Sequence, residues 1–313
     1  ANGDRYRSGQ TERTVHRACN LCEAICGLEF KVKDDRIVSI KGDEADPLSR
    51  GHICPKAIAL KDLHEDQDRL RRPVKRTTSG WQEIDWDEAF DLTVSRLLDI
   101  RGQHGANSIG AYLGNPNAHN LGSMTHAQHF LGPLKTRNRF SATSVDQLPQ
   151  NLVAFWMYGH QWLQPIPDID HAKYLLVLGA NPMVSNGSLM TVPGFRDRLR
   201  ALQRRGGRMV VIDPRRSETA LVANEHHFIR PGTDAALLLG LLHTLFNEQL
   251  VDLRQLAGIV DDLELVRGAI GAFSPDAAAT ITGIGADTIR RHGTRRHRRP
   301  TGLHRLCAGG GTG

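Results

Sequence analysis

Apolar and polar residues largely alternate in two short stretches near the start of the chain, residues 28–32 and 36–40. A period of two is typical of half-buried strands. Asp34 and Asp35 lie between the two stretches and favour a turn. The pattern therefore predicts a β-hairpin, and we place it in a small, mainly β domain at residues 14–72.

From about residue 105 onward, short continuous apolar runs replace this alternation. They predict buried strands at residues 108–113, 174–178, 209–212 and 227–229. Helical stretches follow or separate them at about 195–205 and 234–248, and two more begin near residues 274 and 286. Buried strands that alternate with helices indicate a parallel, doubly wound sheet.

A further helix is predicted between the two regions. Asp85 is a suitable N-cap, because acidic residues follow it in what would be the first turn. The apolar face of this helix would consist of Phe90, Val94, Leu97 and Leu98.

The length of 313 residues allows about two domains. No run of about 18 apolar residues occurs, so we expect no membrane span. The start of the chain shows neither an apolar signal segment nor a twin-arginine motif. These observations favour a cytoplasmic protein with reduced thiols.

The formal net charge of +6 belongs to the end of the chain. From Arg290 onward there are seven arginines and no acidic residue, whereas residues 1–289 carry 33 basic and 34 acidic side chains. A nucleic-acid interaction would therefore depend on the tail alone. We expect no nucleic-acid partner for the rest of the chain.

Four cysteines carry the strongest chemical signal. Cys19, Cys22 and Cys26 have the spacing C-x2-C-x3-C, and Cys54 follows after a gap of 27 residues. Four thiolates of this kind suit a cubane iron–sulfur cluster. Zinc is the nearest alternative, although zinc sites more often pair two short C-x(2–4)-C segments. A disulfide framework fits less well, because the domain is long enough to bury a core and no secretory signal is seen.

Turns rich in Gly, Asn, Pro or Asp follow three of the predicted strands. They begin at Gly179, Asp213 and Arg230. Ligands of parallel sheets bind beyond the carboxyl ends of the strands, where glycines and helix N-termini accommodate phosphate. Asp213 could accept a hydrogen bond from a ribose hydroxyl or a guanine amine. Each turn alone is more often an ordinary connection than a ligand site, but three turns on one sheet edge strengthen the case for a nucleotide site. The absent G-x-G-x-x-G motif argues against a standard NAD-binding half.

Together these segments resemble the N-terminal part of the molybdenum/tungsten bis-molybdopterin-guanine-dinucleotide oxidoreductases, the dimethyl sulfoxide reductase family. The similarity extends from about residue 14 to about residue 290. It is greatest to formate dehydrogenases and assimilatory nitrate reductases, which keep an N-terminal 4Fe–4S domain. The segments that carry it, in chain order, are the C-x2-C-x3-C…C-P-K motif, Gly179-Ala180-Asn181-Pro182, Ile212-Asp213-Pro214-Arg215 and Arg230-Pro231-Gly232-Thr233-Asp234.

The resemblance implies an α/β architecture: a mainly β 4Fe–4S domain at residues 14–72, then a doubly wound, Rossmann-like pterin-dinucleotide-binding domain at residues 73–290. The four cysteines would hold the 4Fe–4S cluster. By its position alone, Lys56 is either an ordinary surface lysine or a cation that tunes the potential of the cluster or bridges to a second cofactor. The resemblance implies that it lies between the cluster and a pterin. Residues implied to contact the guanine nucleotide are Gly179, Asn181, Pro182, Asp213, Arg215, Gly232, Thr233 and Asp234.

The implied cofactors are the cluster and a Mo-bis(molybdopterin guanine dinucleotide), or its tungsten form. Chemistry on a small-molecule substrate would occur at the metal, and electrons would pass through the cluster to a ferredoxin, flavoprotein or quinone-linked subunit. A non-catalytic iron–sulfur electron-transfer subunit and an inactive fragment are the alternatives.

One segment departs from the family pattern. Family members usually present Cys, selenocysteine, Ser or Asp to the metal near the start of the second domain, and the corresponding residues 140–149 contain no Cys. Ser144 and Asp146 are the candidate metal ligands, and Asp146 is preferred. For each of them a helix-capping role is an equal alternative. The missing Cys argues against a typical formate dehydrogenase and leaves the substrate open.

The last segment, residues 291–313, is basic and ends in a run of glycines. Family members are more than twice as long, so we expect a truncated chain or a reading frame lost near Arg291, in which Cys307 is incidental. A basic tail that binds RNA is the alternative. A truncated chain would expose apolar faces and would be poorly soluble.

Overall fold

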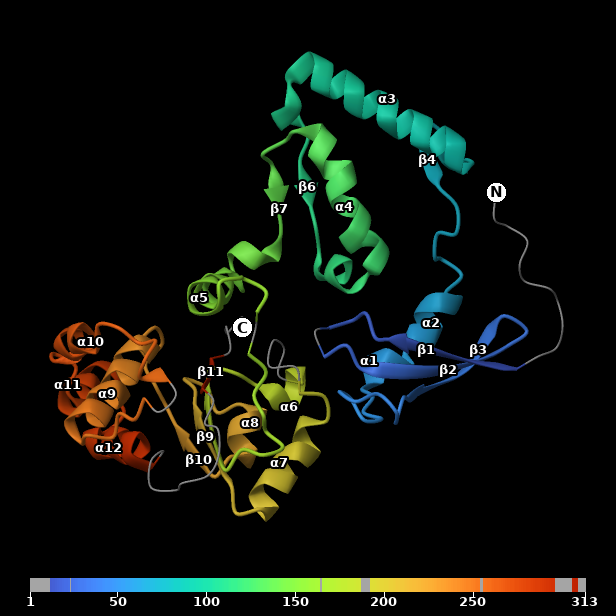
Figure 1. Cartoon of the computed structure of the whole chain (residues 1–313). Coiled ribbons are helices and arrows are strands. Elements are labelled where there is room, and N and C mark those ends of the chain that lie inside the picture. The colour runs from blue at the N-terminus through green and yellow to red at the C-terminus, as the bar shows by residue number, and fades with distance from the viewer. Residues whose placement is uncertain are drawn as a thin grey trace. The chain divides into compact units, whose positions relative to one another are not determined.

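The computed structural model describes residues 12–22, 24–163, 165–186, 192–253, 256–295 and 306–308 (Figure 1). The chain divides into two compact units, residues 1–153 and 154–313. Each unit is described by itself.

The first unit begins with a three-stranded antiparallel sheet in the order β1-β2-β3. The predicted hairpin is present: β2 (Gly27–Lys33) pairs with β3 (Arg36–Gly42). Asp34 and Asp35 both have positive φ, at 50° and 57°, as a tight hairpin turn of the I′ type requires. The sequence did not predict β1 (Arg13–Ala18), which pairs with the other side of β2. Two short helices follow, α1 (Pro55–Ile58) and α2 (Leu60–Glu65).

A second hairpin, β4 (Val74–Thr77) and β5 (Gly80–Glu83), leads into the predicted helix α3 (Trp86–His104). Asp85 caps this helix, because its carboxylate accepts a hydrogen bond from the Glu88 N–H at 2.8 Å. The apolar face is not buried as expected. Phe90, Val94 and Leu98 are all more than half exposed.

The remainder of the first unit contains a small parallel pair, β6 (Ala111–Tyr112) and β7 (Arg139–Phe140). The strand predicted at 108–113 is thus much shorter. Its first residue, Ser108, instead closes a 3-10 turn by donating from its N–H to the Gly105 carbonyl. The other elements here are η1 (Ala106–Ser108), η2 (Asn115–His119), α4 (Leu121–Leu134), η3 (Ala142–Ser144) and α5 (Leu148–Tyr158), which continues past residue 153.

The second unit is built on the predicted parallel sheet, in the order β10-β9-β8-β11 (Figure 1). Its strands are β8 (Tyr174–Leu178), β9 (Arg208–Ile212), β10 (Glu225–His227) and β11 (Leu306–Ala308). The last predicted strand therefore begins two residues earlier than expected, at Glu225. All five side chains of β8 are buried, which explains its continuous apolar pattern.

Helices cover both faces of this sheet, as a doubly wound fold requires. One face packs on α7 (Phe195–Arg204) and α8 (Glu218–Val222), and the other packs on α9 (Asp234–Asn247), α11 (Pro275–Thr282) and α12 (Ala286–Arg295) (Figure 1). Alternate residues of β8 belong to the two cores: Leu175 and Val177 pack in the core on the first face, and Leu176 and Leu178 pack in the core on the second. Two further helices are α6 (Pro182–Ser185) and α10 (Leu263–Ile270).

The start of the expected atypical tail takes part in this packing. Residues 291–295 complete α12, and His292 is only 4% exposed. A Cβ atom added at Gly293 would lie 2.9 Å from the side chain of Thr244, so helices α12 and α9 are in close contact there. Residues 306–308 form β11, and the rest of the predicted tail lies outside the described residues.

In the part of the chain that the structure describes, no helix combines the length and apolar character that crossing a membrane requires.

Candidate cofactor-binding sites

The four cysteines come from two loops of the first unit. Cys19 directly follows β1, Cys26 directly precedes β2, and a hydrogen bond from the Cys19 N–H to the Cys26 carbonyl (2.8 Å) closes the loop between them. Cys54 is the N-cap residue of α1 on the second loop. The pairing of β1 with β2 therefore fixes the spacing of two cysteines, and Pro55 begins the helix that carries the fourth.

All four thiols are free and share one small core. Cys19 and Cys26 are each 6% exposed, and Cys22 and Cys54 pack against them. Among the described residues, no three of these sulfur atoms lie within 4.8 Å of one another. Zinc bonds of about 2.3 Å would hold sulfurs about 3.8 Å apart. No three of the sulfurs therefore have the spacing of a closed zinc site in the described residues.

Burial raises the pKa of Cys19, and raises the pKa of Cys26 to about 11. Cys22 and Cys54 add to both effects through their charge, so Cys54 lies close to the two buried thiols. The exposed Lys56 acts in the opposite direction on Cys19. Binding of a cationic core must therefore displace thiol protons, which Lys56 assists at Cys19.

A polar support behind Cys26 was missed from the sequence. Gly27 donates its N–H to the buried Ser49 hydroxyl at 3.0 Å, and the Ser49 hydroxyl and N–H both donate to the Asp46 carboxylate at 2.6 Å. These hydrogen bonds lower the pKa of Asp46. The D-x-x-S spacing of Asp46 and Ser49 is a local turn signal that could have indicated this contact.

In the second unit, the three predicted turns follow adjacent parallel strands, so they meet at one edge of the sheet. Gly179 and Gly232 both have positive φ, at 60° and 77°, which glycine adopts readily. The Gly179 N–H donates to the Ile212 carbonyl at 3.0 Å. Helix α6 begins at Pro182 and α9 at Asp234, so helix N-termini face this edge.

Asn181 is held by other residues of the site. Its amide oxygen accepts from the Thr219 N–H (3.1 Å) and hydroxyl (2.7 Å), and its amide nitrogen donates to Glu218 at 2.7 Å. This side chain thereby fastens the turn after β8 to helix α8. The partners are 37 and 38 residues away in the chain, so no local pattern predicts them.

The turns after β9 and β10 are also joined. Asp213 is 7% exposed, accepts from the Arg215 N–H at 2.7 Å and donates its own N–H to the His227 carbonyl at 3.2 Å. Thr233 donates its hydroxyl to the Arg230 carbonyl at 2.6 Å. The Arg230 guanidinium, at the start of the third turn, donates to the Thr280 carbonyl at 2.6 Å.

The candidate metal ligands lie in the first unit. Ser144 ends η3, is exposed, and donates to the Ser141 carbonyl at 3.4 Å. The Oδ1 atom of Asp146 is buried and has no hydrogen-bond partner among the described residues. A buried carboxylate oxygen without a partner is costly unless a ligand satisfies it.

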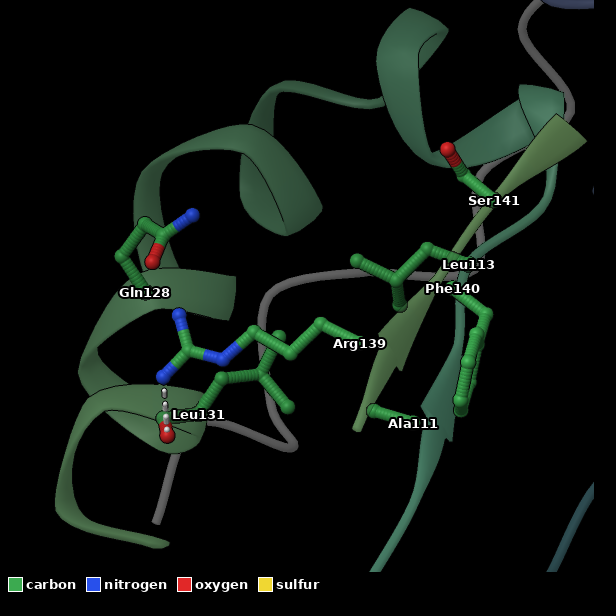
Figure 2. A pocket seen from close by; sticks show the side chains of 7 residues that line it. All are labelled: Ala111, Leu113, Gln128, Leu131, Arg139, Phe140 and Ser141. Carbon is green, nitrogen blue, oxygen red and sulfur yellow. Dashed lines mark hydrogen bonds between the residues drawn. The ribbon is translucent and has the colours of Figure 1, made fainter. Parts of the chain in front are cut away.

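A hollow of about 180 Å³ lies next to this segment, between α4 and the strand pair β6–β7 (Figure 2). Arg139 reaches across it and donates to the Leu131 carbonyl at 3.0 Å. The other lining residues shown are Ala111, Leu113, Gln128, Phe140 and Ser141. None of the predicted site residues lines this hollow.

Comparison with known families decides between the interpretations of the cysteine motif. Residues 12–63 match the molybdopterin oxidoreductase Fe4S4 domain, and residues 69–307 match molybdopterin oxidoreductase. The chain belongs to the molybdopterin oxidoreductase family. The expected cofactors, a 4Fe–4S cluster and a Mo or W bis-molybdopterin guanine dinucleotide, are those of this family.

Named relatives agree with this assignment. A nitrate reductase of Symbiobacterium thermophilum is 27% identical over 87% of this chain and 37% of its own length. Formate dehydrogenase H of Escherichia coli is 26% identical over 89% of this chain and 39% of its own length. The solved structure of acetylene hydratase from Pelobacter acetylenicus superposes with a TM-score of 0.73 at 26% identity, over 89% of this chain and 38% of that one. The chain thus spans about two fifths of the length of these relatives.

Proposed function

We propose that this chain is the N-terminal, cofactor-binding part of a molybdopterin oxidoreductase of the formate dehydrogenase or nitrate reductase kind. The observation that carries the proposal is the set of four free thiols gathered in one core, on the same chain as a sheet edge built from three joined turns. One matched protein is named a hydratase, so membership of the family does not by itself imply redox chemistry. We propose the redox chemistry of this chain separately.

Cys19, Cys22, Cys26 and Cys54 would hold the 4Fe–4S cluster. Their donor chemistry fits, because thiolates are the usual cluster ligands and all four are free. Lys56 supplies a positive charge beside Cys19 and so favours the thiolate form. We propose that it lies on the path of electrons between cluster and pterin.

At the sheet edge, the backbone of Gly179 and Gly232 would approach the nucleotide part of the pterin cofactor closely. Asp213, Arg215, Thr233 and Asp234 would supply polar contacts. Pro182, at the start of α6, and Asn181 would position the turn after β8. Bound there, the molybdenum or tungsten cofactor supplies the two-electron chemistry, and the protein supplies position and electrostatics.

We assign the protein ligand of the metal to Asp146 in preference to Ser144. The Oδ1 atom of Asp146 is buried without a hydrogen-bond partner, whereas the Ser144 hydroxyl is exposed and bonded to the Ser141 carbonyl. A carboxylate would also replace the Cys that many family members present. The electron partner would be a ferredoxin, a flavoprotein or a quinone-linked subunit.

The test is metal analysis of the chain produced with the pterin cofactor available and purified without oxygen. The proposal predicts molybdenum or tungsten in addition to iron. Asp213→Ala should reduce molybdenum and leave iron unchanged, because the two sites use different residues. Iron without molybdenum or tungsten would support the second candidate, an electron-transfer subunit, and contradict the proposed enzyme.

A further inference from the structure

A second cluster of potential metal ligands lies in the second unit, where α12 packs on strand β10. Glu225 and His227 are alternate residues of β10, and His292 is on α12. The two histidine Nε2 atoms are 3.0 Å apart. A Glu225 Oε2 atom lies 3.5 Å from the His227 Nε2 and 3.7 Å from the His292 Nε2. Three donor atoms therefore converge from segments 65 residues apart.

The triangle has the size of a metal site. An atom equidistant from these three donors would lie about 2.0 Å from each, and zinc bonds imidazole nitrogen and carboxylate oxygen at about 2.0–2.2 Å. Two imidazoles and one carboxylate suit zinc and other divalent first-row transition metals. Three protein ligands also leave a position for water.

Surrounding groups hold the ligands in this orientation. His292 is 4% exposed, and its Nδ1 lies 2.9 Å from the Tyr174 hydroxyl. Arg208 donates to Glu225 Oε1 at 2.9 Å, and Arg291 donates at 2.6 Å to Oε2, the oxygen that lies near the two histidines. The remaining polar atoms of metal-binding histidines and carboxylates normally have such partners, which here are Tyr174 and Arg208. The two arginine charges oppose a cation, so we expect moderate affinity.

The same contacts can exist without a metal. One histidine can donate to the other, and Glu225 can serve only the two arginines. In that case the cluster is a buried polar network that joins α12 to the edge strand. Both interpretations predict that the residues support stability, so metal binding itself must be measured.

We propose that Glu225, His227 and His292 form a binding site for a divalent first-row transition metal, with zinc as the expected ion. The metal fastens helix α12 to β10, which is an edge strand of the sheet. The ligand atoms belong to neither the cysteine core nor the turns of the sheet edge. The proposal is therefore independent of the proposed function.

The first test is a zinc titration of the full chain by equilibrium dialysis and elemental analysis, with variants in parallel. Wild type should bind one zinc more than Glu225→Gln or His227→Asn, or bind it at least tenfold more tightly. The difference between wild type and variant isolates this site whatever the cysteines hold. His171→Asn is the matched control, because His171 pairs with Asp168 at 2.9 Å on the exposed surface of the same unit. It should bind as wild type does.

Thermal unfolding provides the second readout. Zinc should raise the Tm of wild type and His171→Asn, because a ligand that binds only the folded state stabilises it. It should not raise the Tm of His227→Asn to the same extent. His227 is 22% exposed, so this variant is the more tolerant one should Glu225→Gln not fold. Equal zinc content, affinity and Tm response in wild type and His227→Asn would overturn the proposal.

Discussion

At the scale of single residues, Gly27 allows the chain next to Cys26 to pack tightly against Asp46. A Cβ atom at this position would lie 2.5 Å from the Asp46 Cβ, which is too close for any real pair. We therefore expect Gly27→Ala to displace the loop beside Cys26. Overpacking of this kind costs about 1–3 kcal/mol.

Denaturant unfolding and iron content would measure this effect. Gly102→Ala is the matched control, because nothing lies within 4 Å of a Cβ atom there and Gly102 is inside helix α3. That change should be neutral or stabilising by about 0.5–1 kcal/mol. Unaltered stability and iron content in Gly27→Ala would show that the loop is not held by this contact.

Asp46 makes the support of Gly27 sensitive to acid. Hydrogen bonds from Ser49 hold the pKa of Asp46 below its ordinary value of 3.8. The stabilisation is therefore complete above about pH 4 and is lost as the pH falls through the lowered pKa of the folded state. Ser49→Ala should destabilise the protein more at pH 7 than at pH 3, as measured by urea unfolding. An equal loss at both pH values would mean that the Asp46 charge is not involved.

The side chain of Asn181 makes contacts that no local sequence pattern predicts. Its place in Gly179-Ala180-Asn181-Pro182 predicts a nucleotide contact, which stays a prediction, and its amide also bonds to Glu218 and Thr219. Asn181→Asp would set a second carboxylate against Glu218, whose oxygen is 2.7 Å from the amide nitrogen that would be replaced. Because Glu218 is exposed, solvent screens this repulsion, and we expect only a modest loss of stability.

The double variant Asn181→Asp/Glu218→Gln should regain most of the stability lost in Asn181→Asp, because glutamine can donate to the new carboxylate. Thermal unfolding of the two variants and of Glu218→Gln alone would measure this coupling. Absence of rescue would assign Asn181 a role other than joining the turn to α8.

At the scale of elements, the strands that lie inside the parallel sheet were predictable and the marginal ones were not. The sequences of β8 and β9 are continuous apolar runs, because helices cover both faces of these strands. Such runs predict buried strands. β1 is mostly exposed and polar, so only its pairing with β2 makes it a strand. β11 lies in a segment without apolar periodicity.

Helix α3 formed as predicted, but its apolar face lacks the expected cover. Trp86, Phe90, Val94 and Leu98 are all more than half exposed in the described structure. An apolar stripe of this kind promotes self-association. The isolated chain should therefore be poorly soluble, and Phe90→Glu/Val94→Lys should shift it toward a monomer on a sizing column. A monodisperse wild-type monomer would contradict this expectation.

At the scale of the whole molecule, the order and spacing of the motifs predicted the family, and family matches over residues 12–63 and 69–307 confirm it. The α/β class and the parallel sheet were predictable for the same reason. Residues that connect the site, such as Glu218 and Arg230, could not be predicted, because their partners lie 37 to 51 residues away.

The iron and sulfide content of the anaerobically reconstituted chain, compared with that of Cys54→Ala, tests the cluster assignment. We expect about four iron and four sulfide per wild-type chain, as a cubane cluster requires. Cys54→Ala should retain clearly less iron, because Cys54 is the ligand supplied by the second loop. A wild-type chain that takes up one zinc instead, or no more iron than the variant, would show that the four cysteines do not hold an iron–sulfur cluster.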